Sequence, residues 1–480
     1  MIGLARLAAP IACFGIAVLL MARTRNNRIA GLCYAAVGAV LLVAAQTRPL
    51  ALAGAIVGLA VLGPALAWLF RREPWLVAYL ALATLPIRVH FLGHQLLVPL
   101  YIVAAGAGFK LLWEFVEGDE RSREFGRATK PLALYLLWIG LSMAWTGDIR
   151  AGAIDVIAFY LPLSILALSV ARLPWEPRRL KLLYAELVAM ALVFACVGFH
   201  QYETRHIFEN PKLNVGNSYA SLFRVNSVFY DPSIYGRFLV VALVPTVVLI
   251  VRGKSLRAGL AALAFAVVAW LGLLVSFSQS SFSALFIAVL CLCAFLLRVK
   301  TKFVVVAAVV LLVGGAVAAP KLTHSLCHHG ASEVNSLTSG RGSLICTGLR
   351  IAKRHPVNGV GLGGFSSAYS KLTHRHVKQS ASHNTPVTVA AEGGVIGLAL
   401  FLWLVIAFGL SAFRRIDRTL AGDLALAAGL VLVAIFVHAN AYNDFFEDPT
   451  TWLVFGLIAL SATRRSQASP MAQPSAMIEP

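Results

Sequence analysis

Residues 382–408 read SHNTPVTVAAEGGVIGLALFLWLVIAF, a polar start followed by an apolar run long enough to cross a bilayer. Pro386 is compatible with the first turn of a helix, so a membrane-spanning helix is expected to open there. The preceding loop, residues 321–386, holds eight Lys or Arg, one acidic residue and seven histidines. A polar loop of this kind between apolar runs indicates that chemistry takes place at one membrane surface.

The composition excludes a soluble fold of this length, because 59% of the 480 residues are hydrophobic and only 13% are charged. Apolar runs of about 16–25 residues can each cross a hydrocarbon core of about 30 Å as a helix. We predict an all-α, polytopic membrane protein with about 12–15 transmembrane helices. The predicted spans are 4–21, 30–46, 50–70, 75–91, 96–115, 131–146, 152–171, 181–201, 233–251, 258–277, 281–298, 303–319, 387–412, 421–440 and 450–463.

Basic residues recur in every second connection between these spans, and the positive-inside rule makes those connections cytoplasmic. The chain then divides into N-terminal helices over 1–320, with an extracytoplasmic segment at 202–232, and a large extracytoplasmic loop over 321–386. C-terminal helices follow over 387–463, and 464–480 is a disordered cytoplasmic tail. The net charge of +20 therefore reports topology. Without zinc-finger spacing, a phosphate loop or basic–aromatic interleaving, no nucleic-acid partner is expected.

Histidines and cysteines gather in the outward loop. Cys327 and Cys346 could form a disulfide in an oxidising compartment, and two unpaired thiols are the alternative. The loop histidines match no tight tetrahedral pattern, so no metal is expected. His383 differs by its position at the mouth of a span, where rigid structure would hold it as a base. The alternative is a histidine that caps the start of a helix.

Charged residues near the same membrane surface are the second candidate group. Arg224 and Arg341 could bind phosphate oxygens through their guanidinium forks, and anchoring to lipid headgroups is the alternative. Arg237 is expected to pair with Asp231 or to extend toward the surface. Glu392 lies deep in a predicted span, so it is either functional or the partner of a nearby arginine.

A glycine-rich run at 359–364 could cradle a phosphate through its N–H groups, but a tight turn is the interpretation that we favour.

The order of motifs along the chain is informative. A segment that starts at Arg224 ends in Asp231-Pro232-Ser233, and Gly340-Arg341-Gly342 and the run 355–363 follow. His383-Asn384 and Glu392-Gly393-Gly394-x-x-Gly397 close the series. From about Trp138 onward, this order resembles that of the bacterial O-antigen ligase and O-antigen polymerase superfamily.

The resemblance implies an integral membrane glycosyltransferase for cell-surface polysaccharide such as lipopolysaccharide, without metal or cofactor. The donor would be a polyprenyl-pyrophosphate-linked glycan, and the acceptor a glycan or a lipid-linked glycan. His383 would take the acceptor proton, while Arg224 and Arg341 would hold the pyrophosphate as it leaves. Arg350, Asn384 and Glu392 would help to bind substrate. The site would face the periplasm from the bacterial inner membrane, among membrane lipids.

The chain departs from the family pattern at two places. Ser278-Gln279-Ser280-Ser281 stands where members often carry Ser-Arg, and Leu344-Ile345-Cys346 lacks the tryptophan that often follows the loop arginine. Arg350 is therefore an alternative to Arg341. Ligase and polymerase both remain open. The competing class is a transporter or flippase for an anionic lipid-linked substrate.

Overall fold

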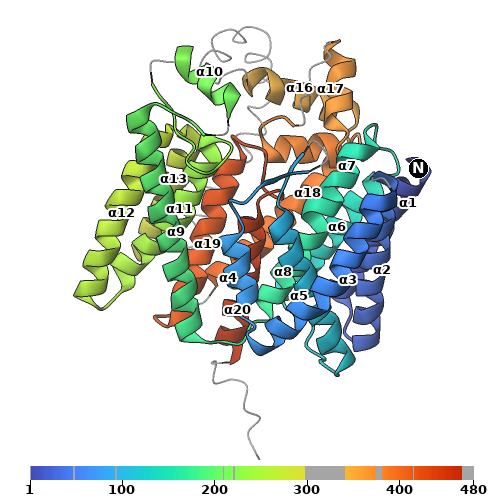
Figure 1. Ribbon diagram of the computed structural model, residues 1–480, viewed down its shortest axis with the longest axis horizontal. Coiled ribbons are helices and arrows are strands. Elements are labelled where there is room, and N and C mark those ends of the chain that lie inside the picture. Colours follow the sequence, from blue (N-terminus) through green and yellow to red (C-terminus); the bar gives the residue numbers. More distant parts are fainter. Residues whose placement is uncertain are drawn as a thin grey trace, which may run out of the picture.

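The computed structural model describes residues 2–46, 49–91, 94–208, 210–219, 222–297, 341–374, 381–414 and 416–467, and within them it is helical apart from one small hairpin (Figure 1). The first half contains α1 (Ile2–Met21), α2 (Arg25–Gln46), α3 (Pro49–Arg72), α4 (Leu76–Ala83), β1 (Val89–Phe91), β2 (His94–Leu96), α5 (Val98–Val116), η1 (Gly126–Ala128), α6 (Thr129–Ser142), α7 (Ile149–Asp155), the π-helix η2 (Val156–Tyr160), α8 (Leu161–Ala171) and α9 (Pro177–Thr204). The second half contains α10 (Pro211–Tyr219), α11 (Pro232–Arg252), α12 (Leu256–Ser276), α13 (Gln279–Leu296), α16 (Arg341–Arg354), α17 (Phe365–Thr373), α18 (Thr385–Phe413), α19 (Leu420–Ala439) and α20 (Pro449–Gln467).

Ten helices in the described ranges are long and apolar enough to cross a membrane, which confirms the prediction of a polytopic helical membrane protein. They are α1, α2, α5, the run α7–η2–α8, α9, α11, α12, α13, α18 and α19. The predicted spans 50–70, 131–146 and 450–463 are also helical, as α3, α6 and α20. The predicted span 303–319 lies outside the described residues.

The predicted span 75–91 is wrong as a continuous helix. α4 ends at the C-cap residue Thr84, two residues before Pro86, which cannot donate the next helical hydrogen bond. β1 then pairs antiparallel with β2, with Val89 opposite Leu96. An eight-residue helix extends only about 12 Å, so α4 alone cannot cross the membrane.

The chain nevertheless crosses at this point. Arg71 at the end of α3 donates to Glu117 at the end of α5, with Nη1 and Oε1 2.8 Å apart. These two helix ends therefore lie together, and residues 73–97 must travel to the opposite end of α5. α4 and the extended chain after it make this crossing. Non-helical backbone at membrane depth is tolerated where protein covers it or where it lines a cavity.

Close packing of small residues joins the N-terminal helices. A Cβ added at Gly31 of α2 would approach the backbone N of Leu19 in α1 to 2.6 Å, so the two backbones touch. Aromatic side chains fill the centre, where α6, α18 and the loop before α20 meet. Tyr135 stacks on Phe446 at 4.7 Å between centroids, and Phe408 stacks on Phe455 at 3.9 Å.

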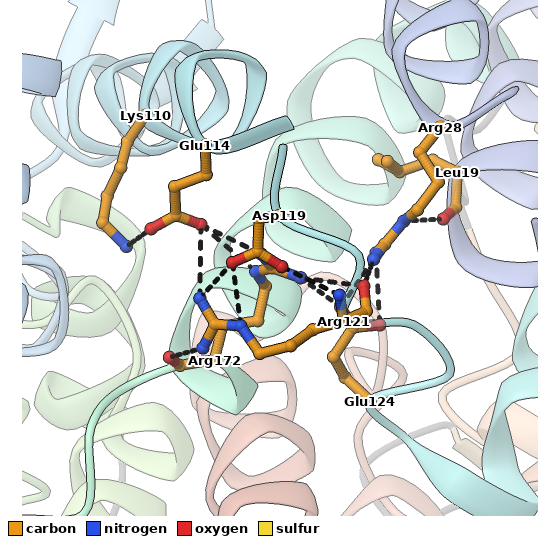
Figure 2. A network of polar contacts seen from close by, with 8 residues as sticks. All are labelled: Leu19, Arg28, Lys110, Glu114, Asp119, Arg121, Glu124 and Arg172. Carbon is orange, nitrogen blue, oxygen red and sulfur yellow. Dashed lines mark hydrogen bonds and ion pairs between the residues drawn. The ribbon is translucent and has the colours of Figure 1, made fainter. Parts of the chain in front are cut away.

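A charge network marks one end of the molecule, which we call the network end (Figure 2). The buried side chains of Arg28 and Arg172 both bind Glu124, and Arg172 also contacts Glu114 and Asp119 at 3.1 and 2.9 Å. These residues come from connections that the sequence predicts to be cytoplasmic, so several basic connections do converge. Phe125 of the same region packs on Phe408 near the end of α18. His383, before the start of α18, therefore lies at the opposite end of this helix, and Figure 1 shows α16 and α17 above α18.

α20 runs through Arg464 and Arg465 to Gln467, so the predicted tail begins as helix. Arg465 donates to the carbonyl oxygens of Ser411 and Arg414 and holds the end of α20 against the end of α18. Residues 468–480 lie outside the described residues.

Candidate functional site at the His383 end

The helix that follows His383 is broken. Within α18, Gly394 has φ 65° and ψ −165°, a backbone conformation that is open essentially to glycine alone. The break removes ordinary helical partners from three consecutive carbonyl groups. Val360 N–H donates to Ala391 O and Gly361 N–H to Glu392 O, each at 2.9 Å, and the Trp138 indole donates to Gly393 O at 2.9 Å. The freed carbonyls are thus satisfied by protein, as a membrane interior requires.

The glycine-rich run is therefore a structural clasp, which we define as residues 356–365. Gly359, Gly361 and Gly363 all have positive φ, and a Cβ on Gly359 would overlap the backbone at Glu392. Leu362 N–H donates to Ser142 Oγ at 3.0 Å, and Phe365 N–H donates to Glu392 Oε1 at 3.2 Å. Because these N–H groups donate to other groups of the protein, the interpretation of the glycine-rich run as a tight turn is confirmed. The clasp joins the sequence motif at 355–363 to the motif that begins with Glu392-Gly393-Gly394.

His383 sits directly before this broken helix in a left-handed conformation, with φ 59°. Its imidazole lies edge-on to the ring of Tyr442, at 6.1 Å between centroids. The neighbouring residues fix the backbone tightly. Ser382 Oγ donates to Asn384 O and is 2.9 Å from Thr388 Oγ1, while Asn384 Oδ1 accepts from Val387 N–H as the N-cap of α18.

Asn384 also ties α18 to α19, since its Nδ2 donates to Asn440 O at 2.9 Å. Both polar atoms of its amide are therefore engaged in structure. These hydrogen bonds fix the backbone next to His383, and the predicted contact of Asn384 with substrate stays a prediction.

Hydrogen bonds also fix the segment that contains Arg224. Asn217 brackets Arg224 by bonding both its N–H and its carbonyl, at 3.1 and 2.9 Å, and the guanidinium Nε donates to Ser276 O at 3.3 Å. Ser227 has φ 53° and exchanges two backbone hydrogen bonds with the Gln201 amide, each 2.8 Å long. The serine run that replaces the expected Ser-Arg packs alongside, where Ser281 Oγ donates to Ser233 O.

Beyond this segment, Tyr230 lines a cavity of about 160 Å³ together with Tyr442. We call this cavity the polar cavity. His383 and Arg224 are not among its lining residues, but His383 contacts the ring of Tyr442, and Tyr230 belongs to the segment that starts at Arg224.

Arg237 lies in the wall of the polar cavity. The expectation for Arg237 is wrong, because its partners are Asp444 and Asp448 from the loop before α20, the latter at 2.9 Å. That loop is more than 200 residues away in sequence, so proximity along the chain pointed to the wrong aspartate.

Arg88 also lines the polar cavity, on the non-helical crossing between α4 and β1. Its side chain is exposed, and among the ion pairs of the described residues it takes part in none. Sequence analysis missed this residue because the segment was interpreted as a continuous span. An arginine directly after Pro86 and beside a turn was the available signal.

A smaller cavity of about 50 Å³ adjoins the polar cavity, and Asp444, Glu447 and Phe159 line both. Glu392 and Asp155 complete its acidic wall. Glu392 forms no ion pair within the described ranges, so the predicted arginine partner is not found there. Burial raises the pKa of Asp444 to about 6, although the charge of Arg237 opposes the rise. Glu447 lines both cavities, and desolvation together with the charge of Asp155 raises its pKa.

The loop helix α16 packs against the start of α18. A Cβ on Gly348 would meet Val387 Cγ1 at 2.7 Å and Ser382 Cβ at 3.1 Å. Arg350 lies on the exposed side of this helix. Arg341 is the first residue of α16, but its side chain lies outside the described structure.

Cys346 of the same helix is disulfide-bonded, which agrees with the expected bridge in this loop. Its predicted partner, Cys327, lies outside the described residues. Within those residues, no three His, Cys, Asp or Glu side chains converge as metal ligands would.

A further cavity at this end has about 460 Å³ and lies between α16, α17 and the loop after α6. Three exposed basic residues, Arg354, His355 and Lys371, line it with Trp145. The lining contains no acidic residue.

Comparison with known proteins agrees with this geometry. No curated protein matches the chain. Residues 261–402 match the family model described as O-Antigen ligase. This range begins in α12 and includes the serine run, α16, the clasp, His383 and the break in α18, whereas Arg88, Arg224 and Arg237 lie before it. The match confirms, over residues 261–402, the resemblance to the O-antigen ligase and polymerase superfamily that the motifs indicated.

Proposed function

We propose that this protein transfers or polymerises a polyprenyl-pyrophosphate-linked glycan at the outer face of the bacterial inner membrane. His383 acts as the base for the acceptor hydroxyl, and arginines bind the pyrophosphate that leaves. A pyrophosphate is already a good leaving group, so a proton acceptor and fixed cations are the groups that the reaction needs most. The acceptor is a glycan or a lipid-linked glycan, and the reaction needs no metal cofactor.

One observation carries the proposal. His383 is held in a left-handed conformation between a capped helix start and the ring of Tyr442, and Tyr442 lines a cavity with Arg88 and Arg237 in its wall. A non-glycine residue in this conformation costs free energy, on the order of 1 kcal/mol or more, and such strain concentrates at functional sites. Tyr442 and Arg237 also lie outside the matched range, so the cavity is independent support.

The test is His383→Ala in purified full-length protein reconstituted with a lipid-linked glycan donor and an acceptor. Transfer should fall by about 100-fold or more, the usual contribution of a general base, while donor binding persists. His374→Ala is a matched control, since this histidine is in the same loop and also has a positive φ, 54°. Full transfer by the His383 variant would refute the proposal, as would equal losses in both variants.

The acidic wall shared by Asp155, Glu392 and Glu447 is the feature that most favours the competing carrier. The same reconstituted vesicles separate the two classes. A carrier would move the labelled lipid between leaflets without His383 and without an acceptor. A transferase would form product only when the acceptor is present.

A further inference from the structure

A second, apolar cavity adjoins the polar cavity. It has about 330 Å³ and lies between α2, α5 and the run η2–α8. Six of its lining residues, all on α2 and α5, are alanine or glycine, and their small side chains leave the groove open. The lining residues on α2 and α5 include Ala35, Ala36, Ala39, Ala104, Ala105 and Gly108.

Two elements connect this apolar groove to the polar cavity. Tyr101, in the first turn of α5, lines both. The π-helix η2 also serves both, with Ile157 in the groove and Phe159 in the polar cavity. A π-helix places an extra residue in a turn and is frequent at functional sites. The polar cavity, which suits a lipid headgroup, and the apolar groove, which suits a lipid tail, are therefore adjacent.

The groove runs into the membrane from this junction. From Tyr101 to Leu112 it follows α5 over about 16 Å, at 1.5 Å per residue. All three of its walls belong to helices that meet the criteria for membrane spans. Its occupant is therefore the apolar chain of a lipid.

The other end identifies the lipid. Arg88 borders the polar cavity with an exposed side chain and makes none of the ion pairs found in the described residues, although its charge acts on Glu447 in the same wall. Arg237 is paired with Asp444 and Asp448. An arginine at a cavity of this kind suits a phosphate oxygen, which it can bind through two N–H groups. His383 contacts the ring of Tyr442, which lines the same cavity.

We infer that the groove between α2, α5 and η2–α8 holds the polyprenyl chain of the lipid-linked donor, and that Arg88 binds its pyrophosphate. This assignment rests on the proposed function, since it names the place of that donor. It adds a binding site whose residues all lie outside the matched range 261–402. The chain then lies along α5, and the head reaches the polar cavity beside Tyr101.

The first experiment uses the native full-length chain in nanodiscs of phosphatidylglycerol. A polyprenyl pyrophosphate with a diazirine on its isoprenoid chain is irradiated, and the adducts are mapped by mass spectrometry. Adducts should concentrate on α2, α5 and residues 157–165, and excess unlabelled polyprenyl pyrophosphate should displace them. Adducts spread over the exposed faces of α9 and α12, or unaffected by the competitor, would overturn the inference and leave a groove for ordinary lipids.

Variants then test each part. Ala105→Phe fills the groove and should raise KM for the donor about tenfold with little change in kcat, because it removes binding far from the reaction. Ile102→Phe is the matched control, since this residue lies on the same helix, is 38% exposed and does not line the groove. Arg88→Gln should reduce adduct formation about tenfold, and Arg88→Lys should restore it only in part.

Equal kinetics for Ala105→Phe and Ile102→Phe would overturn the placement of the polyprenyl chain. Adducts in the groove without any glycan transfer would instead refute the transferase while the lipid site stands. The two proposals therefore fail separately.

Discussion

At the network end, Arg172 is fully buried and its guanidinium contacts Glu114, Asp119 and Glu124. At the His383 end, Arg88 is exposed at a cavity and belongs to none of the ion pairs of the described residues. Both ends concentrate charge in a protein that is mostly apolar. The two ends differ in which groups pair with their charged side chains. At the network end the cations pair with carboxylates inside the protein and hold helices together. At the His383 end the exposed Arg88 shares a cavity wall with carboxylates, and it is the cation that we propose to bind the ligand.

The largest expected effect comes from breaking the charge network around Arg172. Arg172→Ala leaves three carboxylates near one another without their shared cation, so we expect a destabilisation of about 3–5 kcal/mol. Thermal unfolding in detergent measures it. Arg71→Ala is the control, because the Arg71–Glu117 pair has side chains 31% and 51% exposed and should contribute at most about 1 kcal/mol. Similar losses in both variants would mean that the network stabilises the protein no more than an exposed ion pair does.

The second effect concerns the clasp that shapes the His383 end. Gly394→Ala puts a Cβ against the Val357 carbonyl at a positive φ, so we expect a loss of about 2–4 kcal/mol and a large fall in transfer. Gly409→Ala in the same helix is the control, since a Cβ there meets nothing within 4 Å. It should be neutral or stabilising by about 0.5–1 kcal/mol. A tolerated Gly394→Ala would show that the break in α18 is dispensable.

The two ends should also respond to pH in opposite ways. Burial acts to raise the pKa of Asp119, but hydrogen bonds from Arg121 and the charge of Arg172 outweigh it and lower that pKa to about 2. Its stabilising contribution is therefore present above about pH 4 and is lost as pH falls through 2. Asp444 has its pKa raised to about 6, so its contribution is full below about pH 4 and is lost as pH rises through 6.

Melting temperatures of the wild type, Asp119→Asn and Asp444→Asn across pH 2.5–7 measure this contrast. Asp444→Asn should flatten the decline between about pH 4 and 6, an effect of at most about 3 kcal/mol, at 1.36 kcal/mol for each pKa unit. Asp119→Asn should alter only the acidic limb. If both substitutions changed the same limb, the contrast between the two ends would be wrong.

The sequence predicted the helical membrane fold and the basic connections because hydropathy and charge act along the chain. It also singled out His383, Asn384 and Glu392 as one motif. It could not show that the clasp satisfies the carbonyls of a broken helix, since the hydrogen bonds join residues 30 or more positions apart. Arg237 and Asp444 are farther apart still, and no periodicity links them. Arg88 was hidden because Pro86 was not weighed against the apolar run around it.

The smallest effect separates two tryptophans at the His383 end. Both donate to backbone carbonyls near the clasp, Trp138 to Gly393 at 2.9 Å and Trp145 to Asn358 at 3.2 Å. The Gly393 carbonyl lies at the break of a membrane helix. Trp138→Phe removes its hydrogen-bond donor and leaves the buried oxygen unpaired, so the free energy of unfolding should fall by about 1–3 kcal/mol. Asn358 borders the cavity of about 460 Å³, where water can replace the indole, so Trp145→Phe should cost less than about 1 kcal/mol. Unfolding measurements on both variants give the ranking. Equal costs would mean that water reaches the break in α18. Polar groups that pair only inside the protein would then be confined to the network end.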